Sequence, residues 1–190
     1  MLRSLVGSEM CIRDRDMQFV LDELVDLHEI AALPGYGEAT PDLARAVLEE
    51  AGVFASEVIA PLNHSGDIEG VRLEGGQPRM PAGWAQAYAR FVEAGWPALS
   101  APEEQGGQNL PGVLAAAVEE MWNSGSVAFG LLSLLSRGAV NVLRHAGSPE
   151  LQQQYLPRMV SGEWTGTMVL TEPQAGSDLS AVRTRATRQT

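Results

Sequence analysis

Apolar side chains recur at helical spacing along most of the chain. Near the start they fall on one stripe of a helix, at Met17, Val20, Leu21, Leu24 and Val25. Leu33-Pro34-Gly35 is expected to end this short helix. Thr40 and Pro41 then supply an N-cap and a first-turn proline for a longer helix, which we expect Pro61 to end. Residues 63–78 carry glycines and charges without a period, which predicts an exposed excursion with room for one short hairpin.

The helical pattern continues from Pro81 to about Glu163. Its first helix has an aromatic stripe, with Gly95 as C-cap, formed by Trp84, Tyr88, Phe91 and Val92. The stretch Val127–Leu135 is apolar on nearly every side and too short to cross a bilayer, which predicts the buried centre of a helical domain. A small polar face at Ser133, Ser136 and Asn141 could line a pocket, or its hydroxyls could bond back to the preceding turn.

The pattern changes at residue 164. Threonine and branched apolar residues predict a strand at Thr165–Thr171, and alternation predicts a second, half-exposed strand from Val182 to Arg188. Pro173 blocks a helix between them, and Gly176 permits close approach of another group. Such an edge suits a flat, polar-rimmed ring followed by a phosphate, although an ordinary strand end and turn fits the composition equally well.

Composition and charge narrow the choice of partner. The 190 residues are 45% hydrophobic, which supports a sizeable core, and the net charge of −11 disfavours nucleic acid and anionic membranes. Cys11 is the only cysteine and the three histidines are scattered, so we predict no metal site. The chain contains no lysine, which excludes a phosphate-binding P-loop.

These patterns together predict a mainly α fold with three parts. Residues 1–15 lack a clear period and are expected to be a non-native or disordered leader. Residues 16–163 form the helical domain, and residues 164–190 form the first strands of a β domain. Because those strands have too few partners to complete their hydrogen bonds, we expect the chain to be truncated.

Several segments resemble one enzyme family in the order in which they occur. Leu170–Leu179 (Leu-Thr-Glu-Pro-Gln-Ala-Gly-Ser-Asp-Leu) resembles the flavin-contacting signature of the acyl-CoA dehydrogenases. Upstream, Pro102–Gln108 resembles that family's Pro-Glu-x-x-Gly-Gly turn, and Tyr155–Met159 resembles the segment that leads into the signature. Arg15–Leu21 and Gly162–Met168 are most similar to the long subgroup that includes 3-methylmercaptopropionyl-CoA dehydrogenase.

This resemblance implies the N-terminal helical domain of an FAD enzyme of fatty acid metabolism, followed by the first strands of a truncated β domain. Such an enzyme introduces an α,β double bond into an acyl-CoA thioester, with 3-methylmercaptopropionyl-CoA as the candidate substrate. By resemblance, Met168, Leu170 and Thr171 contact the flavin ring, and Gly176 and Ser177 lie by the pyrophosphate. Ser177 also takes the position that contacts the CoA part of the substrate.

The resemblance assigns no catalytic residue to this chain. In the family the base is a carboxylate of a C-terminal helical domain, so the fragment alone is expected to be inactive. Glu172 and Asp178 are interpreted as bracing their turn, and the adjacent Glu103 and Glu104 as part of a solvated turn. The resemblance further implies electron-transfer flavoprotein as electron acceptor, a homo-oligomer at full length, a cytoplasmic location and no membrane span.

Two other classes of function stay open at this point. One is a helical interaction module without a cofactor, which would be favoured if residues 165–178 were disordered or buried against the chain's own helices. The other is a flavoprotein of the same fold with different chemistry, such as an acyl-CoA oxidase or a flavin monooxygenase.

Overall fold

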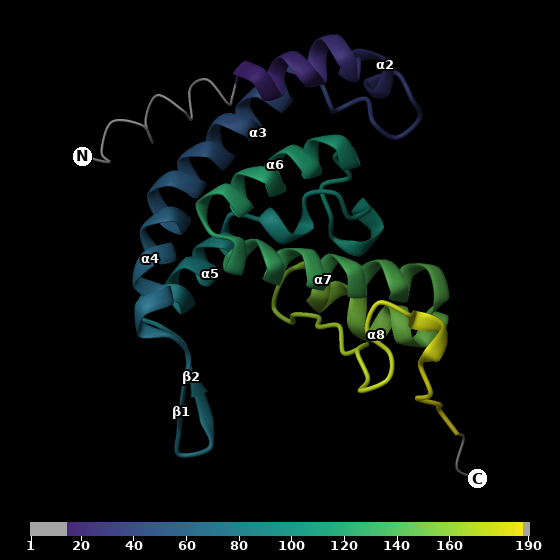
Figure 1. Ribbon diagram of the computed structural model, residues 1–190. Coiled ribbons are helices and arrows are strands. Elements are labelled where there is room, and N and C mark those ends of the chain that lie inside the picture. Colours follow the sequence, from purple (N-terminus) through teal and green to yellow (C-terminus); the bar gives the residue numbers. More distant parts are fainter. Residues whose placement is uncertain (1–14, 188–190) are drawn as a thin grey trace.

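The computed structural model describes residues 15–187, and helices dominate it (Figure 1). Residues 15–19 are helical. The elements that follow are η1 (Val20–Leu24), α2 (Leu27–Ala31), α3 (Pro41–Phe54), η2 (Ala55–Ile59), α4 (Ala60–Glu69), β1 (Arg72–Glu74), β2 (Gln77–Arg79), α5 (Trp84–Glu93), η3 (Trp96–Ala98), η4 (Glu103–Gln105), α6 (Gly112–Gly125), α7 (Val127–Ala146), α8 (Pro149–Val160) and η5 (Leu179–Ala181). The mainly α prediction is confirmed, whereas the leader predicted at residues 1–15 lies outside the described residues except for its last.

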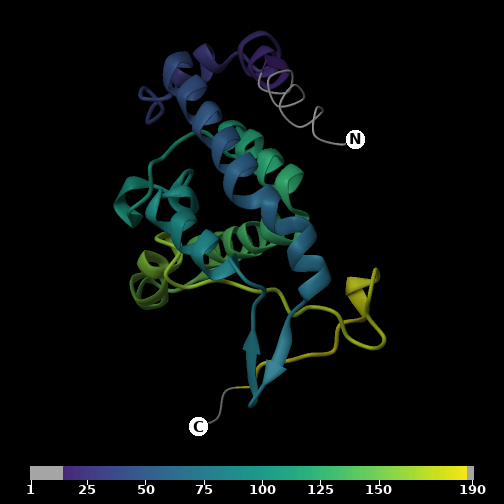
Figure 2. The same cartoon turned by 90° about the vertical axis from the view of Figure 1, so that its left-hand side faces the viewer.

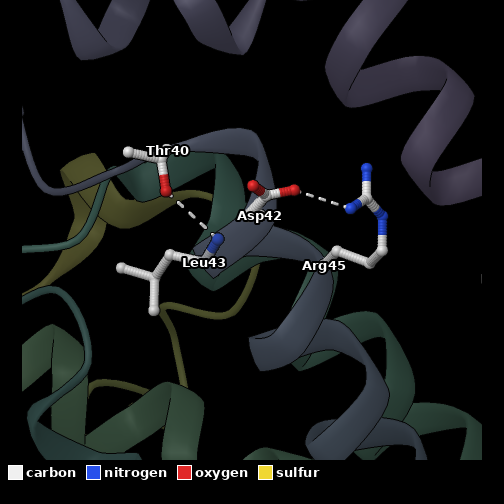
Figure 3. Close-up of polar contacts among 4 residues, drawn as sticks. All are labelled: Thr40, Asp42, Leu43 and Arg45. Atoms are coloured by element: carbon white, nitrogen blue, oxygen red, sulfur yellow. Dashed lines mark hydrogen bonds and ion pairs between the residues drawn. The ribbon is translucent and has the colours of Figure 1, made fainter.

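The start of α3 follows the local chemistry that the sequence predicts. The Oγ1 of Thr40 accepts a hydrogen bond from the backbone N–H of Leu43 at 3.2 Å, and Pro41 occupies the first turn. Arg45 and Asp42 form an ion pair at 2.8 Å on the exposed side of the same turn (Figure 3). The cap satisfies one of the backbone donors that a helix leaves free at its start, so this boundary is fixed locally.

The prediction that Pro61 ends this helix is wrong. Figure 2 shows α3, η2 and α4 as one long run that continues to Glu69. η2 is a π-helical turn, in which the N–H of Ala60 bonds to the carbonyl of Ala55 five residues earlier. Because this wider turn directly precedes Pro61, the ring avoids the carbonyl that it would strike in a regular α-helix. The exposed excursion predicted at residues 63–78 is therefore wrong up to Glu69, which ends α4. The short hairpin expected within it follows that helix, where β1 and β2 pair antiparallel.

The main core is aromatic and lies between α3, α5 and α6. Trp122 is only 1% exposed, and its ring centroid lies 5.5 Å from Phe54, 5.8 Å from Phe91 and 5.1 Å from Trp96. These pairs meet edge to face, an arrangement that aromatic quadrupoles favour. The stripe predicted on α5 therefore belongs to the core, and Gly95 follows that helix in the left-handed conformation expected of a C-cap glycine.

α7 is not the buried centre that its composition predicts. Phe129, Gly130 and Val140 are buried, but the opposite face of the helix is exposed, at Val127, Leu131, Leu134 and Val142. α6 and α8 both pack against α7 (Figure 1), and the face of α7 that they leave uncovered stays exposed. At 20 residues α7 is long and apolar enough to span a membrane by length and composition alone. It packs on α6 and α8, and the expected absence of a membrane span stays a prediction.

The strands predicted at 165–171 and 182–188 are absent from residues 165–187, where the backbone is irregular. A strand requires a neighbour for its backbone groups, and in the described part of the chain β1 and β2 pair only with each other. What remains of the predicted order is a turn, in which Glu172 and Ala175 exchange backbone hydrogen bonds, and the short η5. The division predicted at residue 163 stays a prediction.

Candidate functional site

We call residues 162–178, which carry the predicted flavin contacts, the flavin segment. It leaves the helical domain through residues 162–164, which contacts on several sides hold in place. The hydroxyl of Tyr88 on α5 donates to the carbonyl oxygen of Gly162 at 2.7 Å, and burial raises the pKa of this phenol, so it stays protonated. The N–H of Trp164 donates to the carbonyl of Arg158 at 2.9 Å. The Trp164 ring lies 5.9 Å from the ring of Tyr155 and 4.7 Å from the Arg158 guanidinium.

Gly166 is the next contact with the helices, and it lies directly on α7. Its N–H donates to the Oγ of Ser136 at 3.2 Å. A Cβ at this position would lie 2.4 Å from the Cβ of Ala139, so a side chain could not be accommodated without movement. At Gly166 the segment therefore lies so close to α7 that any larger residue would force one of them to move.

Beyond Gly166 the segment becomes exposed. Met168, Val169 and Leu170 are 66%, 95% and 41% exposed, and Thr171 is exposed as well. The structure thus gathers the predicted ring contacts on one accessible run. Burial of this run against the chain's own helices would favour an interaction module without a cofactor. The run is exposed instead.

Glu172 organises the turn that follows. Its carboxylate accepts hydrogen bonds from the backbone N–H groups of Arg183 and Thr184, each at 2.9 Å, from the hydroxyl of Thr184 and from the side-chain amide of Gln174. These donors, the Thr184 hydroxyl foremost, lower the pKa of Glu172 to about 2. The carboxylate is ionised at neutral pH and its lone pairs are occupied. These bonds support the interpretation that Glu172 braces the turn, and its exclusion as the base stays a prediction.

Asp178 braces the far side of the same turn. Its Oδ1 accepts from the backbone N–H of Ser180 at 3.0 Å and also from that residue's hydroxyl, which caps η5. Gly176 and Ser177 lie exposed between the two carboxylates. In the described part of the chain no atom lies within 4 Å of where a Cβ of Gly176 would be. Internal packing therefore does not require this glycine, and the open backbone fits the close approach of a pyrophosphate such as that of FAD.

A pocket of about 60 Å³ lies between α6, α7 and the start of the flavin segment. Ser133, Ser136 and Asn141 line it, which confirms the pocket alternative for the polar face of α7. Arg137 of α7 pairs with Glu119 of α6 at 2.6 Å in its wall. Burial raises the pKa of Glu119, and the Arg137 charge opposes that rise. Sequence reasoning missed this pair, although an arginine in the middle of an apolar helix was a signal for a partner.

Among residues 15–187 no three histidine, cysteine or acidic side chains are grouped so that they could hold a metal ion. The predicted absence of a metal site stays a prediction. The candidate site is accordingly the run from Met168 to Asp178. Glu172, Gln174 and Asp178 form the hydrogen bonds of its turn, and Thr171 and Ser177 offer hydroxyls beside the backbone groups.

Comparison with known proteins places the chain among acyl-CoA enzymes. A family model described as the N-terminal domain of acyl-CoA dehydrogenase matches residues 41–163. The chain is similar to 3-methylmercaptopropionyl-CoA dehydrogenase of Ruegeria pomeroyi, with 48% identity over 92% of this chain and 30% of the relative. It is also similar to butyryl-CoA dehydrogenase of Syntrophomonas wolfei, with 34% identity over 90% of this chain and 28% of the relative. The chain thus spans less than a third of the length of these relatives.

A solved structure supports the same fold. It comes from work on the electron transferring flavoprotein of Acidaminococcus fermentans and flavin-based electron bifurcation, and it matches with a TM-score of 0.60. The match covers 73% of this chain and 34% of that one, at 23% identity. At this identity the likeness concerns the helical fold alone.

Proposed function

The chain belongs to the acyl-CoA dehydrogenase family, and we propose that its segment 168–178 binds FAD in an enzyme that introduces an α,β double bond into an acyl-CoA thioester. The observation that carries the proposal is the contrast within this segment. Apolar and backbone groups from Met168 to Thr171 are exposed, while Glu172 and Asp178 fix the turn that follows. A segment ordered by its own polar bonds and open on its other side suits a cofactor edge.

When bound, FAD accepts the hydride that the β carbon of the acyl group loses. The residues of this chain supply binding and orientation. We propose that Met168 and Leu170 meet the ring through their backbone groups and that the Thr171 hydroxyl donates to a ring acceptor. Gly176 admits the pyrophosphate, and Ser177 binds it and the CoA part of the substrate.

We propose no catalytic base within this chain. Glu172 is the carboxylate nearest in sequence to the proposed ring contacts, but four donors already occupy its oxygens. A general base needs a free lone pair within hydrogen-bond reach of the substrate proton. We assign the base to the part of the relatives' length that this chain does not span, and for that reason we expect the chain alone to be inactive.

The substrate and partners are proposed from the relatives. The 48% identity to 3-methylmercaptopropionyl-CoA dehydrogenase supports 3-methylmercaptopropionyl-CoA as the substrate to test first. Electron-transfer flavoprotein as acceptor, a homo-oligomer at full length and a cytoplasmic location complete the proposal. Measuring the full-length enzyme with electron-transfer flavoprotein and with oxygen as rival acceptors separates a dehydrogenase from an acyl-CoA oxidase or a monooxygenase.

Thr171→Val in the full-length protein tests the proposed site. The substitution keeps the shape of the side chain and removes the donor, so a flavin ring atom loses its partner. We expect FAD affinity or dehydrogenation rate to fall about five- to 150-fold, which corresponds to about 1–3 kcal/mol, with an unchanged melting curve. Thr165→Val, at an exposed threonine before Gly166, is the matched control. Parental flavin content and rate in Thr171→Val would show that Thr171 is only structural.

The 190-residue chain itself gives a second test. The proposed contacts lie on one exposed run. FAD that is bound from one side alone keeps most of its surface in contact with water. We expect weak binding or none when this chain is titrated with FAD. A submicromolar Kd would contradict the proposal that other parts of the enzyme complete the site.

A further inference from the structure

We infer that Ser136 and Ala139 of α7 are positioning residues, which set the place of the flavin-binding segment by seating Gly166. The inference rests on the proposed function of that segment. Two independent features carry it, a hydrogen bond and a steric contact, and both meet at the same residue. We call these three residues, Ser136, Ala139 and Gly166, the α7 seat.

The hydrogen bond joins two parts of the chain that lie 30 residues apart. The N–H of Gly166 donates to the Ser136 Oγ at 3.2 Å in a part-buried position. Among residues 165–171 of the described structure, no other side-chain hydrogen bond reaches the helices. A buried amide that is left unpaired is unfavourable. This bond therefore favours one distance between the segment backbone and α7.

The steric contact acts in the same direction. A Cβ on Gly166 would lie 2.4 Å from the Ala139 Cβ, far inside van der Waals contact, and 3.2 Å from the Cε of Met159. Alanine on α7 and glycine on the segment therefore let the two backbones approach closely. A larger residue on either side would lift the segment.

The seat is close enough to the proposed cofactor contacts to control them. Met168 is two residues beyond Gly166, which places its Cα within about 7–8 Å of that of Gly166. The short linker leaves little chain to absorb a shift. α7 in turn is held by the Arg137–Glu119 ion pair next to Ser136 and by the buried Val140 next to Ala139. The position of α7 thus determines the position of the segment.

Amide hydrogen exchange of the 190-residue chain tests the seat without any flavin. In Ser136→Ala the protection of the Gly166 amide should fall about two- to tenfold, the range expected for one lost hydrogen bond. Ser136→Thr, which keeps the hydroxyl, should restore most of the protection. The control is Ser133→Ala, one turn earlier on the same helix and also in the pocket wall, which should leave the Gly166 amide at the parental rate.

Exchanging the methyl group tests the steric half of the seat. Gly166→Ala in the full-length protein should weaken FAD binding about tenfold or more and shift the absorption bands of any flavin that remains bound. Ala139→Gly removes the atom that the new Cβ would strike. The double variant should recover FAD affinity and spectrum relative to Gly166→Ala, beyond what the two single changes predict by addition.

The outcomes separate this inference from the function that it rests on. If Ser136→Ala leaves Gly166 exchange unchanged, or if Gly166→Ala binds FAD as the parent does with the same spectrum, the seat is not a positioning device even though the enzyme uses FAD. If the double variant recovers nothing, the steric half is overturned. If the parental full-length protein binds no FAD, the proposed function fails and the inference fails with it.

Discussion

The aromatic core buries its apolar side chains, whereas the flavin segment exposes its apolar side chains and joins its polar ones to each other. Around Trp122, apolar rings contact one another, and the indole N–H of Trp96 is buried with them without a hydrogen-bond partner in the described structure. From Met168 to Thr184, polar groups contact one another around Glu172, and the apolar side chains of Met168 and Val169 face outward. Burial therefore holds the first region, and a ring of hydrogen bonds around one ionised carboxylate holds the second.

This difference indicates whether each region needs another molecule or domain to cover its apolar side chains. The core covers its apolar side chains with one another. The segment satisfies its polar groups but leaves its apolar run exposed, as expected of a surface that is completed by a cofactor or by other parts of a longer enzyme. The two regions should consequently respond differently to truncation, to an added methyl group and to pH.

The largest expected effect is loss of the core ring. Trp122→Ala removes a side chain that is 1% exposed and leaves a cavity between three aromatic neighbours. We expect a loss of about 3–5 kcal/mol in unfolding free energy, or about 6–20 °C in Tm. Trp164→Ala, at the boundary of the segment, should lose only about 0.5–1 kcal/mol from its contact with Arg158. Equal losses in the two variants would remove the distinction between the regions.

Replacing a glycine by alanine should likewise affect stability in the helical domain and FAD binding in the flavin segment. A Cβ on Gly107 would lie 1.9 Å from the carbonyl oxygen of Ala101, so Gly107→Ala forces the backbone apart and should destabilise the fold by about 1–3 kcal/mol. Gly176→Ala meets no atom within 4 Å in the described chain and should change stability by no more than about 0.5 kcal/mol. It should instead weaken FAD binding in the full-length protein. A destabilised Gly176→Ala with unchanged FAD affinity would contradict this.

The smallest effect is local and depends on pH. The pKa of Glu172 falls from its usual 4.5 to about 2 in the folded turn, so the turn favours the ionised form. This stabilisation is fully present above pH 4.5 and is lost as the pH falls from about 4.5 to about 2. The amide resonances of Arg183 and Thr184 should therefore titrate well below pH 4.5 while the core stays folded.

Glu172→Gln is the control for that titration. It should abolish the pH dependence of the two amides and loosen them already at neutral pH, since a neutral amide is the weaker acceptor. A midpoint near 4.5 in the parent would mean that the bonds to Glu172 do not hold the turn in solution.

Local chemistry made some of these features predictable from sequence. Thr40 caps α3 because its hydroxyl and the N–H that it accepts from lie three residues apart, a spacing that can be read directly. The aromatic stripe of α5 follows from helical periodicity in the same way. The interpretation of Glu172 as a brace relied on the proline turn around it, whereas that of Asp178 relied on its match to the family signature.

The remaining features depend on neighbours that are distant in sequence. Pro61 is tolerated because of a π turn, and no residue between 55 and 59 predicts that turn. The strand predicted at 165–171 requires a second strand, and the exposed face of α7 depends on which side its neighbours cover. The bond from Gly166 to Ser136 and the Glu119–Arg137 pair join residues 30 and 18 positions apart, and only the folded structure brings them together.

The distribution of tryptophans gives the molecule two optical reporters. Of its four indoles, Trp122 is enclosed, Trp84 and Trp96 lie against the core, and Trp164 is 36% exposed beside the flavin segment. Blue emission inaccessible to iodide would report on the core, whereas the quenchable red edge of the spectrum would come from Trp164. Because a flavin absorbs where indole emits, its arrival next to the segment would quench Trp164 first, and the order of quenching would reveal which region the ligand meets.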